Sequence, residues 1–181
     1  MSPYGYVQLF LFGLFCTCAV SDETETCRDP IPQTNIDMDK LYGDWFLGMT
    51  NTLIGRTLNK SQCQPQSMKK INETTFELIS IYNGKTWSRV YSVENASNAG
   101  TWHYVGTNIT EKVIYLSDDG TIMVMAACVP SYSEPVCNLF SKYLPFPSKV
   151  YEEVLDAMEV AGIYLPHCYF RSVSEATCPS I

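Results

Sequence analysis

The chain has 181 residues, of which 46% are hydrophobic and 17% are charged. This length suffices for one domain with a hydrophobic core and is short for two. The formal net charge is −7, and the densest basic cluster is the pair Lys69 and Lys70. The basic face that a nucleic-acid partner requires is therefore missing.

The N-terminal segment is typical of a signal peptide. The first 21 residues contain no Lys, Arg, Asp or Glu, and an apolar run over 7–16 is followed by small residues. Such a run is too short to span a bilayer. We expect a signal peptide over 1–19, cleaved near Ala19 or alternatively at Ser21, and a secreted, extracellular domain over 20–181 that is not an integral membrane protein. A buried N-terminal segment or a membrane anchor is the alternative.

Cysteines and glycosylation sequons agree with secretion. Six cysteines remain after the signal segment: Cys27, Cys63, Cys128, Cys137, Cys168 and Cys178. An even number in a secreted chain indicates three disulfides, for which fifteen connectivities exist. With two histidines and no Cys-x-x-Cys pair, a zinc site is disfavoured. Sequons begin at Asn59, Asn72, Asn95 and Asn108.

A polar arm over 22–42 precedes a series of short strand signals. Alternating, β-branched and aromatic residues predict strands over 45–49, 75–82, 85–93, 101–106, 112–116, 121–129 and 136–143, with a last short strand near 168–173. Tight turns at Asn83-Gly84, 98–100 and 118–120 separate several of them. About eight short strands predict an antiparallel barrel or sandwich.

One amphipathic helix is predicted near the C-terminus. Ser148 is a suitable N-cap and Gly162 a suitable end. Apolar residues recur between them at helical spacing, at Val150, Val154, Ala157, Met158 and Ala161. This stripe predicts that the helix packs against the outside of the barrel.

Several motifs in this order resemble the lipocalin family. They are the Gly43-Asp44-Trp45 triplet, the Ser117-Asp118-Asp119 turn, Leu139-Phe140-Ser141-Lys142, and the single late helix. The segments 151–163 and 173–178 are most similar to the apolipoprotein D, insecticyanin and bilin-binding protein branch. The resemblance implies an all-β, eight-stranded antiparallel up-and-down barrel with one C-terminal α-helix packed on the outside. It also implies that Gly43 and Trp45 are structural, with Trp45 plugging the closed end. Lys142 stands where the family usually has an arginine, and a lysine can still make a cation–π contact with Trp45.

The resemblance further implies two disulfides. Cys27 and Cys128 match a bridge between the N-terminal arm and the seventh strand. Cys63 and Cys178 match a bridge between the second strand and the C-terminal tail. We predict that the remaining pair, Cys137 and Cys168, forms a third bridge.

The function that the resemblance implies is the carriage of a small hydrophobic ligand inside the barrel. Strand alternation places Met123 and Met125 on the inner face if Cys128 faces outward. The ligand-lining residues that we predict are Met49, Trp87, Tyr91, Trp102, Tyr104, Met123 and Met125, with ordinary core packing as the alternative for each. Candidate ligands are a bilin-like pigment, a sterol, a fatty acid or a similar lipid, with no cofactor required.

Two other functions are compatible with a secreted barrel. A secreted interaction protein would act through its loops and have a filled cavity. A thiol-dependent isomerase would need a free thiol, and we expect all six mature cysteines to be bridged. No catalytic residues are recognised, so we expect no enzyme, and a monomer or weak homo-oligomer. Haem binding through His103 is disfavoured, because a lone histidine on a strand is more often an ordinary residue.

Overall fold

The computed structural model describes residues 27–51, 64–82, 84–94, 99–129, 132–145, 151–163, 168–170 and 178. The predicted signal segment and the sequons at Asn59 and Asn95 lie outside these residues. The strands are β1 (Gly43–Asn51), β2 (Pro65–Asn72), β3 (Thr75–Tyr82), β4 (Lys85–Ser92), β5 (Thr101–Tyr104), β6 (Thr110–Leu116), β7 (Ile122–Ala127), β8 (Val136–Ser141) and β9 (Cys168–Phe170). The helices are α1 (Met38–Leu41) and α3 (Tyr151–Val160).

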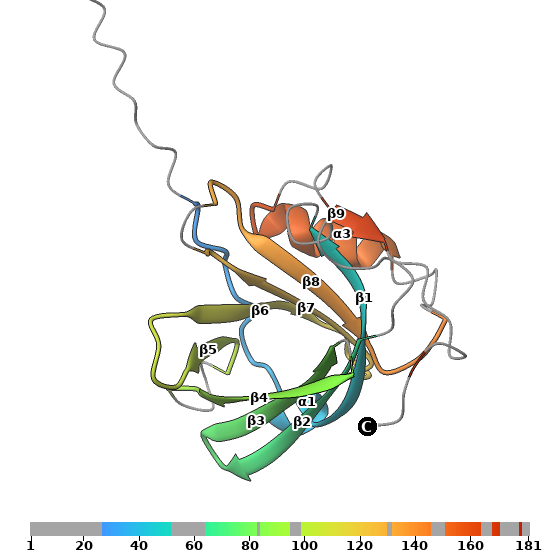
Figure 1. The fold of residues 1–181 in the computed structure, drawn as a ribbon. Coiled ribbons are helices and arrows are strands. Elements are labelled where there is room, and N and C mark those ends of the chain that lie inside the picture. Colours follow the sequence, from blue (N-terminus) through green and yellow to red (C-terminus); the bar gives the residue numbers. More distant parts are fainter. Residues whose placement is uncertain are drawn as a thin grey trace, which may run out of the picture.

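The strands form a closed antiparallel barrel (Figure 1). Each strand from β2 to β7 pairs with the next strand in sequence, and β1 pairs with both β8 and β2, which closes the ring. The predicted eight-stranded up-and-down barrel is confirmed. The short β9 adds to β1 beyond the end of the β1–β2 pairing.

Two elements were missed in the sequence. Strand β2 lacks a clear hydrophobic alternation. One of its inward-facing residues, Gln66, is polar while the next, Met68, is apolar, and the last four residues of the strand are exposed. The short helix α1 is one turn long, and its N-cap Asp37 accepts a hydrogen bond from the Asp39 amide at 3.0 Å. A one-turn helix is too short to show a periodic pattern.

Strand alternation divides the buried side chains into two clusters. Met123 and Met125 of β7 lie in the cluster inside the barrel. Val124 and Ala126, which alternate with them in sequence, belong to a second cluster that includes Val154 and Met158 of α3. The inward orientation of both methionines is therefore as predicted. Helix α3 packs on the outside of the barrel wall, as predicted (Figure 1).

The end of α3 is also as predicted. Gly162 has a φ of +79°, a conformation that glycine adopts without steric penalty. The amide of Ile163 donates to the Met158 carbonyl oxygen at 2.9 Å, as in a helix C-cap. The predicted N-cap Ser148 lies outside the described residues.

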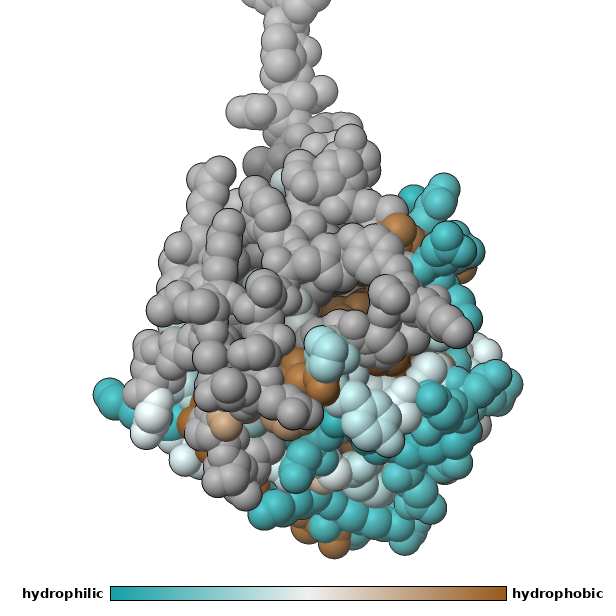
Figure 2. All heavy atoms as spheres, turned by 90° about the vertical axis from the view of Figure 1, so that its right-hand side faces the viewer, coloured by the Kyte–Doolittle hydropathy of each residue, from teal (hydrophilic) through white to brown (hydrophobic). Residues whose placement is uncertain are grey.

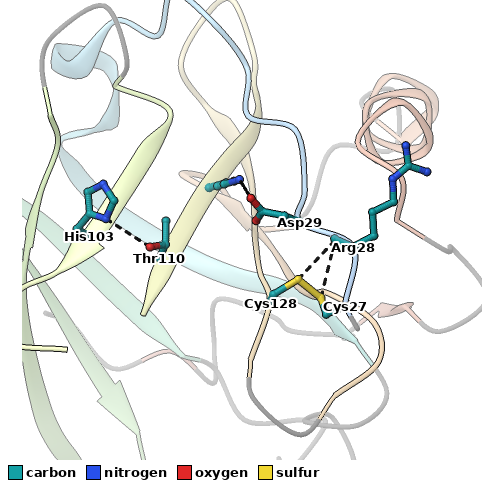
Figure 3. Close-up of polar contacts among 7 residues, drawn as sticks. Cys27, Arg28, Asp29, His103, Thr110 and Cys128 are labelled. Carbon is teal, nitrogen blue, oxygen red and sulfur yellow. Dashed lines mark hydrogen bonds and ion pairs between the residues drawn. A yellow bond between two sulfur atoms is a disulfide. The ribbon is translucent and has the colours of Figure 1, made fainter. Parts of the chain in front are cut away.

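The N-terminal arm is attached to the barrel through side-chain and backbone bonds. The predicted Cys27–Cys128 disulfide is present and joins residues 101 positions apart (Figure 3). Asp29 pairs with Lys112 of β6, and the Gln33 amide donates to the Val113 carbonyl oxygen at 2.9 Å. The arm therefore lies along β6.

The other cysteine pairings stay predictions. Cys178 is in a disulfide, and its predicted partner Cys63 lies outside the described residues. Cys137 is fully buried beneath α3. The backbone of Cys168 pairs with Asn51, so β1 lies between the strands that carry Cys137 and Cys168. Strands separated by a third are about 9.5 Å apart, so a Cys137–Cys168 bridge requires a shift of β9.

Trp45 is buried in the cluster inside the barrel. Its side chain has no exposed surface, and its Nε1 donates to the Leu41 carbonyl oxygen at 2.8 Å. The Lys142 ammonium lies 4.8 Å from the centroid of the Trp45 ring, which confirms the expected cation–π contact. Lys142 Nζ also donates to the carbonyl oxygens of Lys40 and Tyr42, at 2.8 and 3.1 Å. The lysine thus links β8 to the turn around α1.

The turn between β6 and β7 is built around Asp119. Its carboxylate accepts hydrogen bonds from Ser117 Oγ at 2.6 Å and from Thr121 Oγ1 at 2.8 Å. These bonds lower the pKa of the Asp119 carboxyl. The predicted turn residues therefore fix the β6–β7 hairpin.

Candidate functional site

A cavity of about 530 Å³ occupies part of the barrel interior. Its apolar lining includes Leu47, Ile109, Met125, Ala127, Val136 and Phe140. A smaller hollow of about 290 Å³ adjoins it and shares Gln64, Gln66, Trp87 and Arg89. Proteins bind small molecules in cavities of about 300–1,000 Å³, so the larger one has room for a ligand.

Below the cavity the interior is solidly packed. Phe76, Tyr91 and Trp102 are 1% exposed or less and form an aromatic group. The Phe76 and Tyr91 rings stack at 5.5 Å, and the Phe76 and Trp102 rings meet edge to face at 4.7 Å. Trp102 Nε1 donates to the Ala99 carbonyl oxygen at 2.8 Å. These rings and the fully buried Met123 fill the barrel interior below the cavity without lining it, and we call this group the packed floor.

The predicted ligand-lining residues are thus divided by depth. Met125, Tyr104 and Trp87 line the cavity. Trp87 is 56% exposed, which places it at the rim. The other predicted residues with described side chains do not line the cavity but pack in the floor: Tyr91, Trp102 and Met123. This is the core packing given above as the alternative for each of them. Met49 lies in β1, and its side chain is outside what the structure describes.

A charged cluster forms one wall of the cavity. Arg89 of β4 and Glu111 of β6 both line it, and Arg89 Nη1 lies 4.0 Å from Glu111 Oε1. The Tyr91 hydroxyl donates to Glu111 Oε1 at 2.9 Å. The Arg89 guanidinium carbon is 6.0 Å from the centroid of the Tyr104 ring. Burial raises the pKa of the Glu111 carboxyl, and burial together with the Glu111 charge raises the pKa of the Tyr91 phenol.

Neutral polar side chains form another part of the lining. Thr50 of β1 pairs in register with Asn138 of β8, and both face the cavity with Gln64 and Gln66. Within the described part of the chain, Thr50 Oγ1 and Gln66 Oε1 are buried without a hydrogen-bond partner. Unpaired buried polar atoms are costly, so a ligand that bonds to them would stabilise the protein.

Arg89 and Glu111 were missed in the sequence. Arg89 shares its alternation phase with Trp87 and Tyr91, which we predict to line the cavity. A charge at an inward position is therefore the sequence signal that identifies Arg89 as a site residue. Glu111 lies one residue before the strand predicted over 112–116, while β6 begins at Thr110.

Other reactive side chains lie away from the cavity. His103 of β5 is between Trp102 and Tyr104 in sequence, and its Nδ1 lies 3.3 Å from Thr110 Oγ1 (Figure 3). It is not part of the cavity lining. Cys137 lies on the α3 side of β8. In the described ranges no three His, Cys, Asp or Glu side chains gather as metal ligands.

Among the residues coloured in Figure 2, most are hydrophilic, and the hydrophobic ones form small separate patches. Asn72 and Asn108, the two described sequon asparagines, have exposed side chains. No helix in the described residues is long and apolar enough to cross a membrane.

No family model matches the sequence, and no curated protein matches it. Solved structures do match the fold. The cockroach major allergen Per a 4 has a TM-score of 0.63 at 15% identity, covering 84% of this chain and 98% of its own. The siderocalin Ex-FABP has a TM-score of 0.58 at 12% identity, covering 78% and 95%. Lobster apocrustacyanin A1 has a TM-score of 0.56 at 12% identity, covering 83% and 93%. These likenesses, with the closed barrel and outer helix, show that the chain has the lipocalin fold.

Proposed function

We propose that this chain is a lipocalin that binds a small ligand with an apolar body in the open part of its barrel, and that it carries this ligand without chemical change. The observation that carries the proposal is the cavity of about 530 Å³ above a packed floor. Leu47, Met125 and Phe140 offer apolar surface there. Burial of a ligand against such surface contributes about 25 cal/mol per Å².

The depth of the cavity limits how much of a ligand the barrel can hold. Because Trp102, Tyr91 and Met123 fill the interior below it, a ligand occupies only part of the barrel. A bilin-like pigment, a sterol, a fatty acid or a similar lipid remain the candidates, and we infer a branch near apolipoprotein D and the bilin-binding proteins. The siderocalin Ex-FABP functions through dual ligand specificities, and this likeness supports a binding role for the present chain.

We further propose that the protein is secreted and glycosylated, as a monomer or weak homo-oligomer. The Cys27–Cys128 disulfide supports an oxidising compartment. The exposed side chains of Asn72 and Asn108 support glycan attachment at these two sites. The signal segment over 1–19 supplies the route.

The packed floor favours one rival, a secreted interaction protein with a filled barrel. The two functions differ in whether the remaining cavity takes up a ligand. The thiol-dependent isomerase is disfavoured, because Cys137 is fully buried on the α3 side of the wall and does not line the cavity.

Native mass spectrometry of protein purified from its natural source tests the proposal. We expect a complex heavier than the glycosylated chain, whose extra mass is lost on denaturation. A protein that carries no extra mass, and that also binds no apolar dye, would contradict the carrier function and favour the interaction protein.

A further inference from the structure

The cavity contains a cation whose hydrogen-bonding capacity is only partly used. A guanidinium has five N–H donors in a planar fork. This cation is Arg89, which lines the cavity. Its Nη1 lies 4.0 Å from Glu111 Oε1, which is close enough for attraction but too long for a hydrogen bond. Arg89 borders both the main cavity and the smaller hollow beside it, and among the described residues no other partner takes its remaining donors, so a group that enters the barrel can accept from them.

The two charged partners are unequally accessible. The Arg89 side chain is 50% exposed and that of Glu111 20%. Glu111 already accepts a hydrogen bond from the Tyr91 hydroxyl at 2.9 Å. An entering ligand thus meets the guanidinium before the carboxylate, so the pair presents its positive member to the cavity.

Polar atoms elsewhere in the same lining complete a site. Thr50 is 1% exposed, and its Oγ1 lacks a hydrogen-bond partner within the described ranges. Gln66 Oε1 is in the same state. A ligand that only filled apolar space would leave these atoms unpaired, whereas one with a polar head and a further polar group would satisfy them.

We propose that Arg89 recognises the acidic head of an amphipathic organic anion whose apolar body lies against Met125 and Phe140. This inference rests on the proposed carrier function and names its ligand class. The aromatic rings of Tyr104 and Trp87 flank the guanidinium side of the cavity. A planar carboxylate, or two oxygens of a tetrahedral sulfonate or phosphate, matches the arginine fork.

Two dyes with one skeleton test the proposal. 8-Anilinonaphthalene-1-sulfonate is an anion, and N-phenyl-1-naphthylamine is the same ring system without the sulfonate. Each is titrated into the folded protein by fluorescence. We expect the wild type to bind the anion about tenfold more tightly than the neutral dye, the effect of roughly one charge-assisted contact.

Three variants locate the preference. Arg89→Gln is expected to remove the preference, so that this variant binds the anion no more tightly than the neutral dye. Lys69→Gln removes the same charge from an exposed position on β2 and is expected to keep the preference. Glu111→Gln is expected to bind the anion at least as tightly as the wild type, because a negative charge beside the site is gone.

The outcomes separate the two proposals. If neither dye binds, the carrier function itself fails. The anion site is refuted, while the carrier function stands, if the wild type binds both dyes with equal affinity. The same holds if Arg89→Gln lowers the affinity for both dyes alike or raises the affinity for the anion. If Arg89→Gln does not fold, the wild type still decides, because rising sodium chloride should reduce the preference for the anion and spare the neutral dye. A preference that salt leaves unchanged would overturn the proposal.

Discussion

Replacing Lys142 by methionine is predicted to loosen the contacts around Trp45. The substitution keeps an unbranched chain of similar length and removes the ammonium that contacts Trp45, Lys40 and Tyr42. A hydrogen bond from a charged donor contributes about 1.5–3 kcal/mol, and a cation–π contact about 0.5–1 kcal/mol at an exposed site. Lys142 is only half-buried, and burial lowers the pKa of its ammonium, so part of this gain offsets desolvation. We expect a net loss of about 2 kcal/mol in the free energy of unfolding.

Urea unfolding at neutral pH, followed by far-ultraviolet circular dichroism, measures this loss. Lys142→Arg is expected to stay within about 1 kcal/mol of the wild type, because the guanidinium fork can reach carbonyl oxygens and stack on the Trp45 ring. Lys85→Met, an exposed position on β4, is the control for loss of charge and is expected to change stability by less than about 0.5 kcal/mol. A Lys142→Met protein as stable as the Lys85→Met control would refute the role assigned to this lysine.

Three further predictions concern the core, the arm and the charged wall. Met123→Ala in the packed floor should cost about 2–5 kcal/mol, and Met125→Ala at the cavity less; equal losses in urea unfolding would argue against the division into floor and cavity. Replacing both Cys27 and Cys128 by alanine opens a loop that spans 101 positions and should lower the free energy of unfolding by about 3–5 kcal/mol. An unchanged midpoint of thermal unfolding would contradict this stabilising role of the disulfide. Burial raises the pKa of the Glu111 carboxyl, so its contribution to stability is present below the unfolded pKa and is lost as pH rises toward the folded value. The stability of Glu111→Gln relative to the wild type should therefore increase as pH rises from 4 to 8. A difference in the free energy of unfolding that is independent of pH would show that this carboxyl ionises normally.

Much of the barrel follows from local sequence signals. The Asn83-Gly84 turn and the alternating residues on either side of it predict the β3–β4 hairpin near its observed bounds. Gly162 ends α3 where the pattern placed it. The sequence pattern does not predict strand β2, because its inward positions include Gln66, whose burial depends on the rest of the barrel.

The candidate site was less predictable, for a physical reason. Strand parity gives the side of the wall that a residue faces but not its depth along the barrel axis. Tyr91 and Tyr104 face the same interior, yet one packs against Phe76 and the other borders open space. The Arg89–Glu111 pair forms because the short β5 brings β4 and β6 close together. No local sequence pattern encodes this proximity of two strands that are not neighbours in sequence.

Binding of a ligand in the open part of the barrel is tested most directly by one titration. N-phenyl-1-naphthylamine is added to the wild type, an Ala127→Trp variant and a Thr86→Trp variant. Ala127 lines the cavity, while Thr86 is exposed on β4, so both variants gain the same side chain in different places. We predict that the wild type and Thr86→Trp bind the dye with equal affinity and that Ala127→Trp, folded by circular dichroism, loses binding. Equal binding by all three proteins, or by none, would contradict a ligand site in this cavity.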